Sequence, residues 1–282
     1  MRREKYSIED LLHLMARLRS PDGGCPWDRK QSFATIVPST IEEAYEVAEA
    51  IEAEDYDHLH EELGDLLFQV IFYAQLGREA GHFDFSAIVD TLVRKLLRRH
   101  PHVFPSGELY GDNRGELYGD NRGGVTDEDG VKANWEAIKA AERGAKGESG
   151  TLDGVALGLP ALTRAAKLQK RAANVGFDWH DISGVLDKIE EEIAELREAV
   201  ESGDFESARE ELGDLLFSCV NAARHLKVDP ETALRQCNRK FETRFNAVET
   251  SLKKQGRRVA DASLEELDQL WQRVKRAENQ KA

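Results

Sequence analysis

Four acidic residues with helical spacing are the strongest candidates for a chemical role in this sequence. Two of them, Glu192 and Glu195, are three residues apart, and so are Glu211 and Asp214. Residues three apart lie on one face of a helix, so each pair directs two carboxylates the same way. A Ser-Gly-Asp break separates the pairs, and both are symmetric about Gly203. A helical hairpin that turns at this glycine therefore brings four carboxylates together.

This expected quartet of carboxylates predicts a metal site. Apolar neighbours such as Ile193 and Leu212 place the acids at the border of a packed helix face, where unneutralised charge is costly. Ligation by oxygen atoms alone favours a hard cation, so the sequence predicts Mg²⁺ first and Mn²⁺ second. A di-iron carboxylate bundle is the alternative, but it requires a Glu-x-x-His motif on each of two helices. The single candidate, Glu79-x-x-His82, is interrupted by Gly81.

The same acidic pattern occurs twice in the chain. Each acid of the second half has an equivalent 149 residues earlier, and the segment LGDLLF recurs at residues 63–68 and 212–217. The earlier pattern is again symmetric about a single position, residue 54. Internal duplication is the simplest explanation for this repeat. The first-half acids, which are also predicted metal ligands, are Glu43, Glu46, Glu62 and Asp65.

Helices are required to position these acids, and the hydrophobic spacing predicts them. In the first half the pattern predicts helices over residues 7–19, 35–54, 56–80 and 85–99. A basic helix over residues 159–174 precedes the second hairpin. With 40% hydrophobic residues, 33% charged residues and only 7 prolines, the composition suits a protein built of long helices. The predicted fold class is therefore all-α, with two tandem repeated helical domains.

Basic and aromatic residues follow each acidic hairpin and are candidates for nucleotide binding. Lys240 and Arg244 are four residues apart, so they share a helix face, as phosphate-binding cations would. Trp271 and Lys275 have the same spacing and are candidates for stacking on a base and binding a phosphate. The alternative is that the basic residues are ordinary surface charges and the tryptophan is a core residue. The corresponding first-half residues are Lys95, Arg99, Trp135 and Lys139.

Two irregular segments lie between the repeats. Residues 105–124 contain the octapeptide GELYGDNR twice in tandem, and we expect an exposed loop insertion without a function of its own. Residues 146–154 are rich in glycine and polar side chains, which predicts a flexible linker. The expected domains therefore span residues 1–145 and 155–282.

Charge and cysteine content limit the functional classes. The net charge of −14 argues against a protein that binds nucleic-acid polymers, because phosphate backbones require a broad basic surface. An anionic substrate remains compatible when a metal and a local basic cluster neutralise it. Three cysteines without metal-site spacing favour a reducing compartment. Since no apolar run reaches the roughly 18 residues that a membrane span needs, we expect a cytoplasmic protein that does not interact with membranes.

Three further motifs, together with both acidic signatures, make a family recognisable. They are GCPWD at residues 24–28, RRHPHVF at residues 98–104 and NVGFDW at residues 174–179. On these motifs the sequence closely resembles the two-domain bacterial MazG nucleoside triphosphate pyrophosphohydrolases of the all-α NTP pyrophosphatase superfamily. The resemblance covers nearly the whole chain, and the tandem GELYGDNR insertion departs from the family pattern.

The resemblance implies hydrolysis of nucleoside and deoxynucleoside triphosphates to the monophosphate and pyrophosphate, with broad base specificity. It also implies Mg²⁺ as the cofactor of the carboxylates in each half. A homodimer is implied as well, because one acidic hairpin supplies only half of a four-helix bundle. The implied catalytic and metal-binding residues are Glu192, Glu195, Glu211 and Asp214. The implied nucleotide contacts are Lys240, Arg244, Trp271 and Lys275.

The expected mechanism is metal-assisted attack of water on the triphosphate. A carboxylate would orient or deprotonate the water, while Lys240 and Arg244 would neutralise charge that the metal leaves over. Both halves keep four acids, and the resemblance together with the basic helix over residues 164–171 favours the second half as the working one. The alternatives are an enzyme with a narrow substrate, such as dUTP or phosphoribosyl-ATP, and a nucleotide-binding regulator without turnover.

Overall fold

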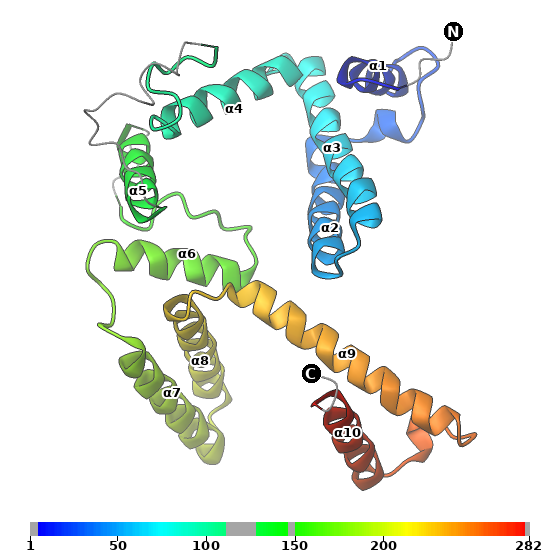
Figure 1. Ribbon diagram of the computed structural model, residues 1–282, viewed down its shortest axis with the longest axis vertical. Helices are drawn as coiled ribbons and strands as arrows, with labels where there is room; N and C mark the ends of the chain where they lie inside the picture. The colour runs from blue at the N-terminus through cyan, green and yellow to red at the C-terminus, as the bar shows by residue number, and fades with distance from the viewer. Residues whose placement is uncertain (1–4, 111–127, 146–149, 280–282) are drawn as a thin grey trace. The chain divides into compact units, whose positions relative to one another are not determined.

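The computed structural model describes residues 5–110, 128–145 and 150–279 of the chain. Within these ranges the chain forms ten α-helices and two short 3-10 helices, without a β-strand (Figure 1). The predicted all-α fold class is therefore confirmed. None of the described helices has the length and apolar character that a membrane crossing requires. The chain divides into two compact units, Met1–Lys139 and Ala140–Ala282.

The first unit is organised around a hairpin of two long helices, α2 and α3, with α1 packed against α3 (Figure 1). Serine side chains begin two of its helices: Ser7 caps α1 and Ser32 caps α2, each bonded to a backbone N–H three residues on. Met15, Ile36 and Phe72 come from three different helices and bury their side chains in one apolar core. The helices of this region are α1 Ile8–Leu18, α2 Phe33–Glu52, α3 Tyr56–Glu79, α4 Phe85–Arg99 and α5 Glu128–Ala145, which runs across the boundary of the units.

The second unit repeats the hairpin with α7 and α8, and α6 packs against α8 as α1 packs against α3. Beyond the hairpin, α10 packs along α9 around Val248, Leu252 and Leu270. The helices of this unit are α6 Ala161–Ala173, α7 Ile182–Ser202, α8 Phe205–His225, α9 Pro230–Lys253 and α10 Leu264–Asn279.

The two hairpins turn at equivalent residues with the same backbone conformation. Gly203 has a φ of 76°, and Glu54, the equivalent residue 149 positions earlier, has a φ of 56°. In each turn the next residue donates its backbone N–H to a carbonyl five residues back: Asp204 to Ala199, and Asp55 to Ala50. The left-handed conformation is easy for glycine and unfavourable for glutamate, so the first turn is strained where the second is not.

An ion pair holds the segment before each hairpin to the end of the hairpin's second helix. In the first unit Arg19, after α1, donates hydrogen bonds from its Nε and Nη2 to the carboxylate of Glu79 at the end of α3. In the second unit the polarity is reversed, because Asp178, before α7, accepts from Arg224 near the end of α8. His225 also lies 3.2 Å from Asp178. The same architectural contact is therefore made with opposite charges in the two halves.

The predicted helices agree with the observed ones to within two residues at their ends, and the helix over residues 85–99 has the predicted bounds. The acidic, basic and tryptophan-containing elements follow one another in the predicted order in both halves. Residues 111–124 of the expected loop insertion and residues 146–149 of the expected linker lie outside the described residues.

Candidate metal and nucleotide site

The second hairpin brings acids from two helices together. Glu192 and Glu195 lie on α7 and Glu211 on α8, and each offers a carboxylate oxygen within 4.8 Å of the other two. Glu192 is buried, with 3% of its surface exposed, whereas Glu195 is exposed. Asp214 lies one turn beyond Glu211 on α8 and acts on it electrostatically. The predicted meeting of acids across the hairpin is thus observed for three of the four residues.

The electrostatics of this cluster favour a cation. Burial raises the pKa of Glu211, and repulsion from Glu195, Glu192 and Asp214 raises that pKa further. Both effects mean that the charged carboxylate is disfavoured in its present surroundings. A divalent cation shared by the carboxylates would remove the repulsion, and the oxygen-only donor set suits a hard ion such as Mg²⁺.

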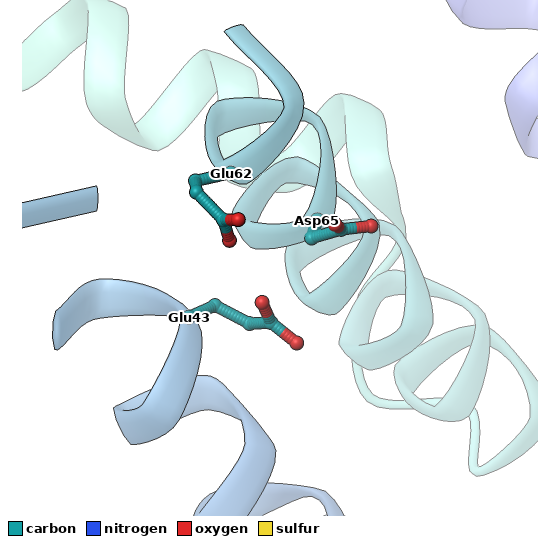
Figure 2. A group of neighbouring side chains, drawn as sticks. All are labelled: Glu43, Glu62 and Asp65. Carbon is teal, nitrogen blue, oxygen red and sulfur yellow. The ribbon is translucent and has the colours of Figure 1, made fainter. Parts of the chain in front are cut away.

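The first hairpin forms an equivalent cluster. Glu43 projects from α2 toward Glu62 and Asp65 of α3, and ligand atoms of the three lie within 4.8 Å of one another (Figure 2). Burial raises the pKa of Glu43 and of Glu62, and nearby carboxylates, including Glu46, raise both further. Gln69, buried on α3, donates a hydrogen bond of 3.3 Å to Glu43. This half therefore also fits a divalent cation by its donor chemistry.

Different cationic or polar partners accompany the two clusters, and sequence reasoning missed both. In the second half Lys188 lies 2.8 Å from Glu192, one turn earlier on α7. In the first half His58 lies 2.7 Å from Glu62, one turn earlier on α3. Neither is duplicated, since Ser39 and Ser207 occupy the equivalent positions. The signal was the four-residue spacing to a predicted ligand, which marks a neighbour on the same helix face.

The predicted nucleotide contacts of the second half gather on α9 and α10. The Arg244 guanidinium lies 5.9 Å from the ring centroid of Trp271, and the ring of Phe241 lies 5.3 Å from the same tryptophan. Lys240 is exposed one turn before Arg244, and Lys275 lies half-buried one turn after Trp271. The structure also adds Glu278, which accepts a hydrogen bond of 2.8 Å from Arg244 and which sequence reasoning did not identify.

The first-half counterpart of this group also gathers around a tryptophan, Trp135. The ammonium of Lys139 lies 4.8 Å from the ring centroid of Trp135, as expected for a cation–π contact. The ring of His100 lies 5.4 Å from the same tryptophan. The contacts of Trp135 thus include Lys139, the counterpart of Lys275, and His100, which follows Arg99, the counterpart of Arg244.

The acidic and basic groups of the second half remain separate. No hydrogen bond, ion pair or ring contact among residues 150–279 joins the four acids of α7 and α8 to Lys240, Arg244, Trp271 or Lys275. A chain of phosphates with a bound cation would bridge the two groups. The cation would bind the acids, and the phosphates would bind the basic residues. Fold and site together define an all-helical protein with a duplicated carboxylate hairpin suited to a divalent cation and a phosphorylated ligand.

Comparison with known proteins places this arrangement in a family. The family model described as "MazG nucleotide pyrophosphohydrolase domain" matches residues 31–104 and 182–249, which contain both acidic hairpins. The chain therefore belongs to the MazG family. The resemblance to this family that the sequence motifs indicated is confirmed, and the family's domain is present twice in tandem.

Relatives that match nearly the whole of this chain support membership of the same family. A nucleoside triphosphate pyrophosphohydrolase of Escherichia coli strain K12 is 48% identical over 273 residues, which cover 96% of this chain and 98% of that protein. The nucleoside triphosphate pyrophosphohydrolase/pyrophosphatase MazG of Thermotoga maritima is 44% identical over 268 residues, 95% of each chain. The uncharacterised protein YabN of Bacillus subtilis is 44% identical over 94% of this chain and 51% of its own length.

Proposed function

We propose that this protein is an enzyme that hydrolyses nucleoside and deoxynucleoside triphosphates to the monophosphate and pyrophosphate, with Mg²⁺ bound by the second hairpin. The observation that carries the proposal is the approach of Glu192, Glu195 and Glu211 to within 4.8 Å of one another inside a region that matches the MazG family. The names of the Escherichia coli and Thermotoga maritima relatives describe the same activity.

The four acids of the second hairpin would hold the cation and act on the attacking water. Bound there, the metal would polarise the phosphate and stabilise negative charge on the pyrophosphate leaving group. A carboxylate that the metal does not neutralise fully would orient the water or accept its proton. The exposed Glu195 and Asp214 are better placed to meet solvent than the buried Glu192. No covalent intermediate is required.

The basic and aromatic residues of α9 and α10 would bind the rest of the nucleotide. Lys240 and Arg244 carry the positive charge that a triphosphate needs beyond the metal. Trp271 offers a ring for stacking on a base, a contact that does not depend on base identity. Lys275, one turn after Trp271, would bind a phosphate. This combination supports broad base specificity.

We assign turnover to the second half. In this half Arg244 lies 5.9 Å from the ring centroid of Trp271, and a basic helix over residues 164–171 precedes the acidic hairpin. The arginine presents a fork of N–H donors that suits phosphate. The first half would then bind a cation more weakly or serve dimerisation.

A homodimer is the second part of the proposal, and the uncovered face of each hairpin supports it. Several large apolar side chains there are 36% or more exposed, and most of them occupy equivalent positions of the duplication. Such a face normally packs against another surface. A second copy of the same hairpin would complete a four-helix bundle. The matched pairs are Val37 with Leu186, Ile51 with Val200, Tyr56 with Phe205, Leu63 with Leu212, and Leu67 with Leu216.

Two helical glycines on the hairpins also point to a close neighbour outside the chain. Gly64 and Gly213 sit inside α3 and α8, and a Cβ added to either would meet no described atom within 4 Å. Glycine costs about 1 kcal/mol relative to alanine inside a helix, so open space alone does not explain it. A partner helix or a bound phosphate that approaches the backbone closely would account for both.

Domain boundaries and location complete the proposal. We retain residues 1–145 and 155–282 as the domains and residues 146–154 as their linker. The three cysteines, Cys25, Cys219 and Cys237, are free thiols, which supports a reducing, cytoplasmic setting. The net charge of −14 supports a protein without nucleic-acid polymers as partners.

Product analysis tests the reaction. Full-length protein incubated with Mg²⁺ and each of the common ribo- and deoxyribonucleoside triphosphates should release pyrophosphate, and a chelator should abolish the release. Release of orthophosphate would contradict the mechanism. Activity confined to dUTP or phosphoribosyl-ATP would instead favour a narrow-substrate enzyme, and binding without turnover would favour a regulator.

Matched substitutions test the assignment to the second half. Glu211→Gln or Asp214→Asn should lower turnover at least about 100-fold, because each removes charge from the metal ligands, while the circular dichroism spectrum stays unchanged. The equivalent controls, Glu62→Gln and Asp65→Asn, should keep most of the activity. The reverse pattern would move the working site to the first half.

A further inference from the structure

Glu278 shares a helix face with the predicted nucleotide contacts of α10. Trp271, Lys275 and Glu278 follow one another at intervals of four and three residues, so all three share one face of α10, from which Trp271 and Glu278 contact Arg244 of α9. From α9, Arg244 donates its Nε–H to Oε2 of Glu278 at 2.8 Å, and its Nη2 lies 2.8 Å from the same carboxylate oxygen. A carboxylate thus lies within a group that is expected to bind phosphates.

The contact engages only part of the Arg244 guanidinium. Arginine has five N–H donors in a planar fork, and Glu278 faces the edge formed by Nε and Nη2. Among the described residues Glu278 is the hydrogen-bonding partner of Arg244, so the Nη1 donors stay available for a phosphate. The Arg244 side chain is 16% exposed, and the Trp271 ring lies beside it.

We propose that Glu278 is a positioning residue that holds Arg244 in the orientation that binds the triphosphate. This inference rests on the proposed function. An arginine side chain without a fixed partner samples many rotamers. Binding a phosphate then costs conformational entropy, because one rotamer must be selected. Glu278 fixes one edge of the fork in advance and leaves the other edge for the ligand. The pattern Trp-x-x-x-Lys-x-x-Glu occurs in both halves, at residues 135–142 and 271–278, so the acid belongs to the repeated element.

The opposite role is that of a competitor. If Glu278 occupied the place of a phosphate, its removal would free Arg244 and tighten substrate binding. The geometry favours positioning, because Glu278 takes the Nε edge and not the whole fork. The two roles predict KM changes of opposite sign on loss of the carboxylate.

Kinetics of the full-length Glu278→Gln variant with Mg²⁺ and ATP test the proposal. We expect KM to rise about tenfold while kcat changes less than about twofold, since the lost contact is a charged hydrogen bond that preorganises a binding residue. Glu278→Asp, which keeps the charge on a shorter side chain, should show a smaller rise in KM. This second variant keeps the test decisive if Glu278→Gln does not fold.

A matched control lies on the same helix. Glu266 of α10 pairs with Arg257 through two contacts of 2.5 and 2.8 Å, and neither residue belongs to the predicted site. Glu266→Gln should lower the melting temperature without changing KM. A structural role for Glu278 would give the same pattern, whereas a positioning role changes KM in the folded protein.

The double substitution shows whether Glu278 acts through Arg244. Arg244→Lys alone should raise KM, and adding Glu278→Gln to it should raise KM little further, because residues that act as a unit are not additive. An unchanged or lower KM in Glu278→Gln, beside a raised KM in Arg244→Lys, overturns the positioning role alone. An unchanged KM in both variants overturns the assignment of Arg244 to the nucleotide site as well.

Discussion

The Lys188 ammonium lies 2.8 Å from the buried carboxylate of Glu192 and 2.6 Å from that of Glu191. Its hydrogen bonds with Glu191 and Glu192 raise the pKa of Lys188 well above the ordinary lysine value. The acidic cluster of the second hairpin therefore carries a cation of its own before any metal binds. The first hairpin has a serine, Ser39, at the position of Lys188, and His58 lies beside its Glu62 instead.

Removing this internal cation should make the protein depend more on metal. In Lys188→Met the carboxylates lose a neutralising charge, so the melting temperature in a chelator should fall by a few degrees. Addition of Mg²⁺ should then raise it by more than in the unaltered protein, because a ligand that binds only the folded state stabilises that state. Differential scanning fluorimetry with and without Mg²⁺ measures both effects, and equal Mg²⁺ shifts in the two proteins would argue against a cation site at Glu192.

A charge on the uncovered face of the second hairpin should dissociate the proposed dimer. Leu216 is 52% exposed within one copy, and Leu216→Asp would place a carboxylate in the bundle interface twice, once from each copy. We expect the dimer dissociation constant to rise at least about 100-fold, as measured by light scattering across a dilution series. Leu157→Asp is the control, because Leu157 is 84% exposed and lies outside the hairpins. A monomeric starting protein would contradict the proposal at once.

The turns of the two hairpins allow a reciprocal test of backbone strain. Glu54→Gly should stabilise the protein by about 1 kcal/mol, because glycine adopts the left-handed conformation without a Cβ clash. Gly203→Ala should destabilise it by a similar amount, since the change places a Cβ on a residue with a φ of 76°. Urea unfolding of both variants gives the two signs. Changes in the same direction would show that the turns are not equivalent.

The ion pair between Asp178 and Arg224 should contribute a pH-dependent part of the stability. The hydrogen bond from Arg224 lowers the pKa of Asp178, and His225 assists, while burial opposes. A carboxyl whose pKa is lowered by folding stabilises the protein above its unfolded value of 3.8, and the contribution is lost as pH falls through the lower folded value.

Asp178→Asn should therefore be less stable than the unaltered protein at pH 7, and the difference should shrink once the pH falls below 3.8. Urea titrations at several pH values measure it. Asp187→Asn, which changes an exposed acid of α7, should show little difference at any of these pH values. A stability gap for Asp178→Asn that widens toward acid would contradict the assigned role of the ion pair.

Much of the site was predictable because its determinants are local. The three-residue spacing of Glu192 with Glu195 fixes a shared helix face. The break at Gly203 fixes where the chain reverses, and the symmetry of the acids about that break fixes which of them meet. Lys188 and His58 were also predictable as neighbours of the acids, since each lies four residues before an acid of its cluster.

Other relationships depend on how helices distant in sequence pack. The sequence by itself determined two acidic hairpins, each followed by a basic helix and a tryptophan helix, because helical periodicity and turn chemistry act over a few residues. Only the tertiary structure decided that Glu278 pairs with Arg244, 34 residues earlier, and that Asp178 and Arg224, 46 residues apart, carry the charges that the first half reverses. Long side chains on separate helices meet only when packing sets the distance between the helices and selects the rotamers, and no spacing along the chain specifies either.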